Sequence, residues 1–554
     1  MITQCAQSAP DCSDRLLNVM TGQSNLDLSP PLAMHPALTN LEVICTVSSY
    51  TQRKSLPALA STCRAFKHPA LNALWRDLQS VEPLVKCLPS DLFSIDQGRV
   101  VLQKPIDSKL WDTLFEYSSR VRSITVKSIP SAVIEPLSVL MLTSPSTPAS
   151  WFPNLHKLTW HADGTHKFAP FLRMVLVPSM LVFHMEIFSA CSAFLSVLSC
   201  LGTLCPDLQN MTMRIRRESD DFKLLHQISP FIAQSISQLH HLHTLSVWDS
   251  GSEITEHVMK LRAMQSLSLD LRASSAWGEK PRFQFPGFDH LKRFSLSTLT
   301  VEHASNFFSS LQVVKSKQIK VDVTSQIDTA FSFFTDALMT IPKFFAVLQE
   351  RCDHDKLEYF SLSVGYSKGV RMASDDFTPL RAFPNLTHLL IEGAGNISMS
   401  DEALCQLARA WPKLQVFKIS SYVIIDGSTT VPTFHGLISL LWSCPALTSL
   451  ALVIDTTKSD GIDLKCPGGG RCNKRLESLV LGNSPINVPV NVALIISGLF
   501  PYLKQVDLAC WERPPMNTTA RRKADMNQWA IVNMMLRGFS VASERSIEAW
   551  SDCL

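Results

Sequence analysis

The sequence predicts an α/β protein in which three short helices precede a curved parallel β-sheet with a helical or irregular outer side. Two observations support this: residues 35–80 place apolar side chains at helical spacing, and short leucine-patterned units recur along the rest of the chain. The composition agrees with a folded chain, because 46% of the 554 residues are hydrophobic and only 18% are charged. A chain of this length can hold several ordinary domains or one extended repeat array.

Residues 35–80 predict three amphipathic helices laid end to end. Leu38, Leu41 and Cys45 share one helical stripe. The next two helices carry apolar residues at i, i+3, i+4 and i+7, namely Leu56, Leu59, Ala60 and Cys63, then Leu71, Leu74, Trp75 and Leu78. Three helices of this size form a minimal bundle, either as a separate module or as a cap on a larger domain.

This segment resembles the F-box, in the divergent form common in fungal F-box proteins. The resemblance lies in "LEVI", "LPALASTCRAF", "HPALNALWRDL" and the trailing "VEPLVKCLP". The Pro that usually precedes the first-helix Glu is missing, since Asn40 and Leu41 stand there. The resemblance implies docking on the Skp adaptor of a cullin-based ubiquitin ligase, through Leu41, Glu42, Val43, Ile44, Leu56 and Leu59.

A unit of the form turn, Leu-x-x-Leu-x-Leu recurs after the helices. It begins at Phe152, Cys205, Leu239, Phe288, His354, Phe383, Trp411, Cys444, Asn473 and Phe500. Weaker units begin at Val121, Leu181, Met264 and Ile319. In the last five strong units the first Leu falls at 386, 414, 447, 476 and 503, so the intervals are 28, 33, 29 and 27 residues. This period is typical of a leucine-rich-repeat solenoid, predicted here over residues 121–510.

Each unit predicts a short strand with alternate side chains inward, followed by a return such as 401–411, 435–444 or 491–500. The tract resembles the irregular repeats that follow the F-box in many substrate receptors. The regular family carries Asn or Cys two residues after the third Leu, whereas this chain mostly has other residues there, so turn geometry varies between repeats. An unrelated α/β arrangement is the alternative interpretation.

The remaining segments complete the predicted domain organisation. Residues 1–33 form a polar, disordered tail, 34–80 the F-box-like module and 81–120 a helical connector. Residues 511–554 close the open end of the solenoid, with an amphipathic helix or a pair of helices expected between Met526 and Trp550.

Charge, cysteine usage and hydropathy indicate an intracellular protein that binds proteins. The net charge of +3 gives no electrostatic footprint for nucleic acid or an anionic membrane. Fifteen cysteines without framework spacing, and an amino terminus unlike a signal peptide, predict a cytoplasmic or nuclear location. Residues 187–206 lack charges but predict a buried helix, with Phe188, Cys191, Leu195 and Leu198 facing a core, more than a membrane span.

Catalytic and metal sites are not predicted. Gly365 to Gly369 fits the nucleophile pattern G-x-S-x-G with Ser367 as nucleophile, but the residues that follow make a poor helix for such a turn. Cys466 with Cys472, and the histidines at 240, 241 and 243, lack the paired spacing that zinc requires. No nucleotide or other cofactor is expected, and the chain is not expected to be an enzyme.

The resemblance to the F-box, followed by the repeats, therefore implies a non-catalytic substrate receptor of an SCF-type ubiquitin ligase, or alternatively a repeat scaffold without that role. We expect Leu386, Leu389 and Ile391 to be buried and His388, Leu390 and Glu392 to point out of the concave sheet. The same register places a target-binding set on that face, with Trp248 and Tyr359 as exposed aromatic anchors. The set is Arg214, Trp248, Asp270, Arg293, Tyr359, Glu392, Lys418 and Asp507.

Overall fold

The computed structural model divides into two compact units, Met1–Arg76 and Asp77–Leu554. The first unit ends four residues before the predicted boundary at residue 80, and the predicted connector belongs to the second unit. The structure describes residues 40–89, 91–96, 99–127, 135–140, 151–162, 164–187, 189–215, 223–248, 252–272, 284–324, 341–365, 371–393, 396–419, 429–508 and 520–551.

The described part of the first unit is a bundle of three helices, α1 (Leu41–Tyr50), α2 (Leu56–Thr62) and α3 (Arg64–Arg76), with a 3₁₀ turn, η2 (Arg53–Ser55), before α2. Asn40 begins α1, because its side-chain oxygen accepts a hydrogen bond from the Glu42 N–H at 2.9 Å. Helix α3 packs on both α1 and α2. The core of the bundle consists of the buried residues Ile44, Leu56, Phe66, Ala70 and Trp75.

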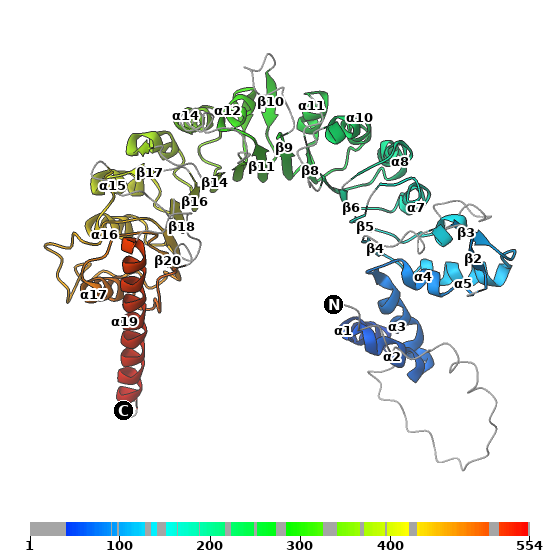
Figure 1. Ribbon diagram of the computed structural model, residues 1–554, viewed down its shortest axis with the longest axis horizontal. Helices are drawn as coiled ribbons and strands as arrows, with labels where there is room; N and C mark the ends of the chain where they lie inside the picture. Colours follow the sequence, from blue (N-terminus) through cyan, green and yellow to red (C-terminus); the bar gives the residue numbers. More distant parts are fainter. Residues whose placement is uncertain are drawn as a thin grey trace, which may run out of the picture. The chain divides into compact units, whose positions relative to one another are not determined.

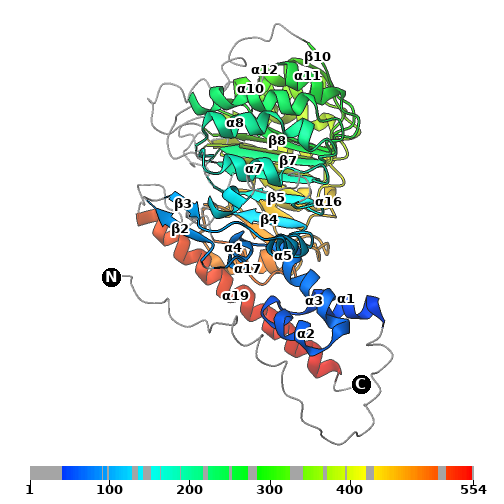
Figure 2. The same ribbon diagram turned by 90° about the vertical axis from the view of Figure 1, so that its right-hand side faces the viewer.

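In the second unit, fourteen described strands form one sheet in chain order, and every neighbouring pair is parallel (Figures 1 and 2). The strands are β1 (Asp77–Leu78), β4 (Ser123–Val126), β5 (Lys157–Trp160), β6 (Val182–Ile187), β7 (Asn210–Ile215), β8 (Thr244–Trp248), β9 (Ser266–Asp270), β11 (Arg293–Thr298), β13 (Gln318–Val323), β14 (Tyr359–Val364), β16 (His388–Glu392), β18 (Val416–Ile419), β19 (Ser449–Ala451) and β20 (Ser478–Val480). This is the architecture of a leucine-rich-repeat solenoid, and all four weaker units also form strands of the sheet.

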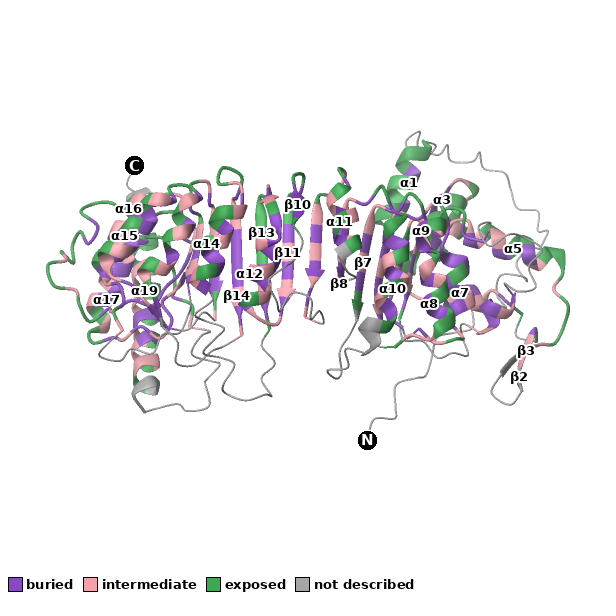
Figure 3. Ribbon diagram, turned by 90° about the horizontal axis from the view of Figure 1, so that it is seen from above, coloured by how far each residue is buried: buried purple, intermediate pink, exposed green. Residues whose placement is uncertain are grey.

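Alternation along each strand separates core from surface, as Figure 3 shows by the change of burial from residue to residue. Leu386, Leu389 and Ile391 are fully buried, whereas His388 and Leu390 are half-exposed and Glu392 is exposed. The predicted register is confirmed. Leu390 pairs with Ser361 on one side and with Lys418 on the other, so its row on the concave face is mostly polar.

Helices cover the outer side of the sheet, and many neighbouring ones pack on each other (Figure 1). Each carries its apolar stripe toward the strands. They are α4 (Glu82–Lys86), α5 (Ser108–Ser118), α7 (Ala169–Val175), α8 (Ser192–Ser199), α9 (Leu201–Leu204), α10 (Lys223–Ser237), α11 (Ser252–Lys260), α12 (Val301–Ser309), α14 (Ile341–Arg351), the 3₁₀ segment η4 (Ser374–Ala382), α15 (Asp401–Ala410), α16 (Phe434–Ser443) and α17 (Pro489–Leu499).

Asparagines in the repeat turns connect neighbouring repeats. Asn154 and Asn385, from the two "FPNL" turns, donate their amides at 2.8 Å to the backbone carbonyls of Ser119 and Asp355 in the preceding repeat. Asn473 does the same with the Leu447 carbonyl at 2.8 Å. These amides pair carbonyls at the turn before the strand, whereas the regular family places its Asn after the strand.

A row of phenylalanines fills the core of the central repeats. Ring centroids are 5.6 Å apart between Phe294 and Phe308, 5.7 Å between Phe308 and Phe344, and 6.0 Å between Phe345 and Phe360. These residues come from β11, α12, α14 and β14, so the row joins elements of three neighbouring repeats. Aromatic side chains bury large areas, and the row supplies the apolar contact that a single repeat lacks.

The closing helix is α19 (Ala520–Ser551), longer than the predicted 526–550. Trp529 is fully buried, and its indole N–H donates to the Ser484 carbonyl at 3.0 Å. The Asn533 side chain accepts from the Val506 N–H at 2.7 Å and donates to the Val506 carbonyl at 2.9 Å. An amide of α19 therefore pairs with the backbone of the last repeat.

The last predicted strand is wrong, because the unit that begins at Phe500 stays irregular. Its backbone still follows the sheet, since the Asp507 N–H donates to the Leu479 carbonyl at 2.8 Å. On its other edge, Asn533 takes the place that a further strand would occupy.

Three further strand pairs were not predicted. Within the expected helical connector, β2 (Phe93–Asp96) and β3 (Arg99–Leu102) form an antiparallel hairpin. Outside the main sheet, β10 (Phe285–Phe288) pairs with β12 (Leu311–Val314), and β15 (Arg371–Ala373) pairs with β17 (Asn396–Ser398).

The uncharged stretch 187–206 divides among the end of β6 and the two short helices α8 and α9. Leu195 and Leu198 are buried as expected, Cys191 is half-exposed, and Phe188 lies outside the described residues. Among the described helices, none combines the length and apolar character needed to cross a bilayer.

Candidate functional site

The concave face presents three rows of outward side chains, set by the strand register. The row nearest the carboxyl ends of the strands pairs Glu186 with Arg214 and Trp248 with Asp270. The middle row pairs Ser246 with Ser268, Ser268 with Ser295 and Ser295 with Lys320. Small hydroxyl side chains thus form the floor of the central repeats, and charged side chains border them.

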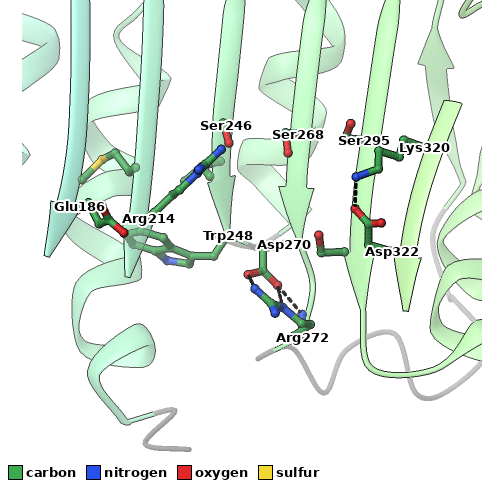
Figure 4. Close-up of a pocket in the computed structure, with 13 residues that line it drawn as sticks. Glu186, Arg214, Ser246, Trp248, Ser268, Asp270, Arg272, Ser295, Lys320 and Asp322 are labelled. Atoms are coloured by element: carbon green, nitrogen blue, oxygen red, sulfur yellow. Dashed lines mark hydrogen bonds and ion pairs between the residues drawn. The ribbon is translucent and has the colours of Figure 1, made fainter. Parts of the chain in front are cut away.

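A pocket of about 590 Å³ lies on this floor, over six neighbouring strands from β6 to β13. Figure 4 shows Ser246, Ser268, Ser295 and Lys320 on the middle row, with Glu186, Asp270 and Asp322 closer to the strand ends. Three of the lining residues are acidic, Glu186, Asp270 and Asp322, and three are basic, Arg214, Arg272 and Lys320. The formal charges of the lining therefore cancel.

Two ion pairs occupy one side of the pocket. Arg272 donates to both carboxylate oxygens of Asp270, from Nε at 2.8 Å and from Nη2 at 2.6 Å. Hydrogen bonding to Asp270 raises the pKa of the Arg272 guanidinium above its ordinary value. The Lys320 ammonium lies 2.9 Å from the Asp322 carboxylate. Both carboxylates on this side are consequently neutralised by a cation within the pocket.

On the other side, Glu186 is held by an imidazole, since its Oε2 lies 3.0 Å from the His161 Nδ1. The His161 ring contacts the His184 ring, with centroids 5.5 Å apart. Burial lowers the pKa of His184, and the neighbouring His161 and Arg214 lower it further, while Glu186 opposes them. His184 is therefore held neutral near pH 7.

Arg214 differs from the other charged groups of the pocket. Its side chain is exposed, and it forms no hydrogen bond or ion pair with any residue that the structure describes. In Figure 4 it extends over the serine floor toward Ser246. The described lining thus contains one cation without a partner, while each of its carboxylates has one.

The eight residues predicted to bind the target all come from the concave side or its carboxyl-terminal continuation, but the pocket contains only three of them, Arg214, Trp248 and Asp270. Arg293 and Tyr359 lie in the row at the amino ends of the strands. Lys418 is in the middle row and Glu392 in the row at the carboxyl ends. Asp507 lies past the last strand.

Trp248 does not match the expectation of an exposed anchor. Only 4% of it is exposed, and its indole N–H donates to the Ser229 hydroxyl of α10 at 2.8 Å. The strand ends at this residue, so its side chain bends over the sheet edge to the helical layer. It forms a wall of the pocket. Tyr359, the other predicted anchor, is half-exposed, and its ring lies tilted beside that of His388 with the centroids 5.4 Å apart.

The sequence interpretation missed Arg272, Lys320, Asp322 and the serine floor. Lys320 and Asp322 alternate with the buried Ile319 and Val321, so the alternation applied to the other strands would have found them. Arg272 follows the end of β9, where alternation gives no information.

In the first unit, the residues implied to contact the adaptor fall into two groups. Leu41, Glu42 and Val43 are exposed, Leu41 to 64% and Val43 to 37%. Ile44 and Leu56 are 2% and 3% exposed and belong to the bundle core, and Leu59 is half-exposed.

Val47 and Tyr50 are also exposed, at 40% and 87%. With Val43 they are spaced i, i+4 and i+7, so they form one apolar stripe on the solvent side of α1.

The residues considered for catalysis and metal binding give no assembled site. Ser367 lies outside the described residues. Cys466 and Cys472 are exposed and free, and in the described part of the chain no group of three or more His, Cys, Asp or Glu is arranged to hold a metal ion. Burial raises the pKa of the Cys352 thiol.

Comparison with known proteins adds little to this picture. No protein-family model and no curated protein matches the chain. A solved structure described as the crystal structure of the TLR13-ssRNA13 complex is 14% identical, with a TM-score of 0.32, over 76% of this chain and 57% of that one. The chain thus spans less than two thirds of that protein's length. The solenoid assignment rests on the parallel sheet and its register.

Proposed function

We propose that this chain is a non-catalytic substrate receptor of an SCF-type ubiquitin ligase. Its first unit would bind the Skp adaptor, and the concave face of its solenoid would bind a target protein. The observation that carries the proposal is the bundle α1–α3, whose sequence resembles the F-box and whose first helix exposes Leu41, Glu42 and Val43.

The exposed stripe of α1 supports adaptor binding on physical grounds. Val43, Val47 and Tyr50 cover one side of a short helix with apolar surface. Apolar side chains in this pattern are the usual anchors when one helix packs into a groove of a partner. The bundle keeps them outward because Ile44 and Ser48 occupy the inward side of α1.

The solenoid supports the second half of the proposal. Parallel strands in chain order give an extended concave surface, which is where solenoids present their binding sites. Joining the two modules in one chain would hold target lysines at high effective concentration near a charged conjugating enzyme. Catalysis by this chain is not required.

The first prediction is that Leu41→Asp together with Val43→Asp abolishes capture of the Skp adaptor by the full-length chain. Both positions are exposed, so the free protein keeps its fold, whereas an unpaired carboxylate in an apolar interface costs several kcal/mol. The measurement is coprecipitation with purified adaptor, with circular dichroism to verify folding. Ile44 is unsuitable for this test, because an Asp there would disrupt the bundle core.

Lys67→Glu is the matched control, since Lys67 is exposed on α3 and lies outside the implied contact set. It should retain wild-type capture. Adaptor binding by the double variant at the wild-type level would exclude the proposed contact, and failure of the wild-type chain to bind would favour a repeat scaffold without a ligase role.

A further inference from the structure

We propose that the concave pocket binds a single carboxylate of an extended polypeptide, with Arg214 as its cation and the serine floor as its hydrogen-bond donors. This deepens the proposed target binding and rests on it only for the biological setting, because the test uses the receptor chain without adaptor or ligase.

The pairing of side chains in the pocket leads to this inference. Glu186 forms a hydrogen bond with the His161 ring, and Asp270 and Asp322 form ion pairs with Arg272 and Lys320. Arg214 has no partner among the described residues, although it lines the same pocket. A ligand with one negative charge would complete the pairing, and a bidentate guanidinium pair is the strongest contact available to it.

The hydroxyls specify where the rest of the ligand lies. Ser246, Ser268 and Ser295 are adjacent in register on three neighbouring strands, are half-exposed, and form no side-chain hydrogen bond with another described residue. Neighbouring strands lie roughly 4.8 Å apart, so the three hydroxyls extend over about 10 Å across the sheet. This row can donate to successive carbonyls of a polypeptide that crosses the strands.

The same charges argue against ligands with higher negative charge. A phosphate group or a nucleic acid strand brings more than one charge, and the other two cations of the described pocket lining are already bound to Asp270 and Asp322. Three carboxylates within the pocket wall would repel the excess charge. A carboxylate, from a Glu or Asp side chain or from a chain terminus, matches the single free guanidinium.

The test uses labelled full-length chain on an array of acetylated, amidated random decapeptides, printed as twins that differ by one Glu or Gln. Wild type should bind the Glu member about tenfold more strongly, the scale of a solvent-accessible bidentate pair. Arg214→Gln should remove the preference for Glu. Arg214→Glu should instead prefer the Lys member of additional twins, printed on the same array, that differ by one Lys or Gln. Lys157→Gln is the matched control, because Lys157 is exposed on β5 of the same sheet and lies outside the pocket, and it should retain the preference.

Two further arms identify the source of the anion. The Gln peptides are also printed with a free carboxyl terminus, which separates recognition of a terminal carboxylate from recognition of a Glu side chain. Binding of either carboxylate that depends on Arg214 supports the proposal. Stronger binding of phosphoserine twins than of Glu twins, or displacement of peptides by polyuridylate, would overturn it. So would equal binding of Glu and Gln twins, a preference unchanged in Arg214→Gln, or no binding above background.

Discussion

Asparagine side chains in the repeat turns form hydrogen bonds between neighbouring repeats. Asn473 is 7% exposed and forms three hydrogen bonds, to the Leu447 carbonyl at 2.8 Å and from the N–H groups of Arg475 and Leu476 at 2.7 and 3.1 Å. Asn385 occupies a similar turn but is half-exposed. Burial therefore decides how much each amide contributes to stability.

Replacing Asn473 with Ala should lower the free energy of unfolding by about 2 kcal/mol, because a buried carbonyl and two N–H groups lose their partner. Urea unfolding monitored by circular dichroism measures the change. Asn385→Ala, where water can replace the amide, should cost under about 1 kcal/mol. Equal losses at the two positions would show that burial is not the deciding factor.

Two glycines inside helices differ in the space that surrounds them. A Cβ built on Gly538 of α19 meets no atom within 4 Å, whereas one on Gly498 of α17 lies 2.5 Å from the Pro467 Cγ. The same substitution should therefore change stability in opposite directions.

Gly538→Ala should stabilise the protein by up to about 1 kcal/mol, since Ala is the better helix former at an exposed interior position. Gly498→Ala should destabilise it, because Pro467 must move to admit the new methyl group. Thermal unfolding of both variants beside the wild type is the measurement. A gain in melting temperature for Gly498→Ala would contradict the packing described for α17.

Element prediction from sequence succeeded where a local pattern repeats and failed where tertiary context decides. Nine of the ten strong leucine units form strands of the main sheet, because buried leucines at fixed spacing impose the register. The unit at Phe500 has the same leucine pattern, but its outer edge is paired by Asn533 of α19, which lies 27 residues after its partner Val506 in the sequence. The hairpin of β2 and β3 carries no leucine pattern and was missed.

At the site, alternation alone placed Arg214 and Asp270 on the concave face, but it gave no information about ion pairing. That Asp270 is neutralised by Arg272 depends on how the chain turns after β9. The burial of Trp248 depends on α10, which supplies Ser229.

The whole molecule should lose stability on acidification before its carboxylates titrate. Burial lowers the pKa of His184, His303 and His388 in the folded chain. The His303 Nδ1 is buried and has no partner in the described part of the structure. Because each folded pKa is depressed, the unfolded chain binds protons first, and stability falls with pH below the ordinary histidine value of about 6.5.

The melting temperature should accordingly be lower at pH 5.5 than at pH 7.5. His303→Gln combined with His184→Gln should reduce that difference, while His241→Gln, at an exposed position, should leave it unchanged. Asp289, whose pKa is lowered by hydrogen bonding to Lys315, titrates below this pH window. A melting temperature that is constant across the window would contradict the burial of these imidazoles.

The amide of Asn533 offers one donor and one acceptor to the backbone of a single residue, Val506, and makes no demand on the side chain of that residue. The hydrogen bonds that end the array are thus independent of the side chain at position 506, whereas the apolar face of α19, with Trp529 buried, is matched to the last repeats. An open sheet edge would invite a second copy to add its own strand, so one side chain also helps to keep the solenoid from growing into a fibre.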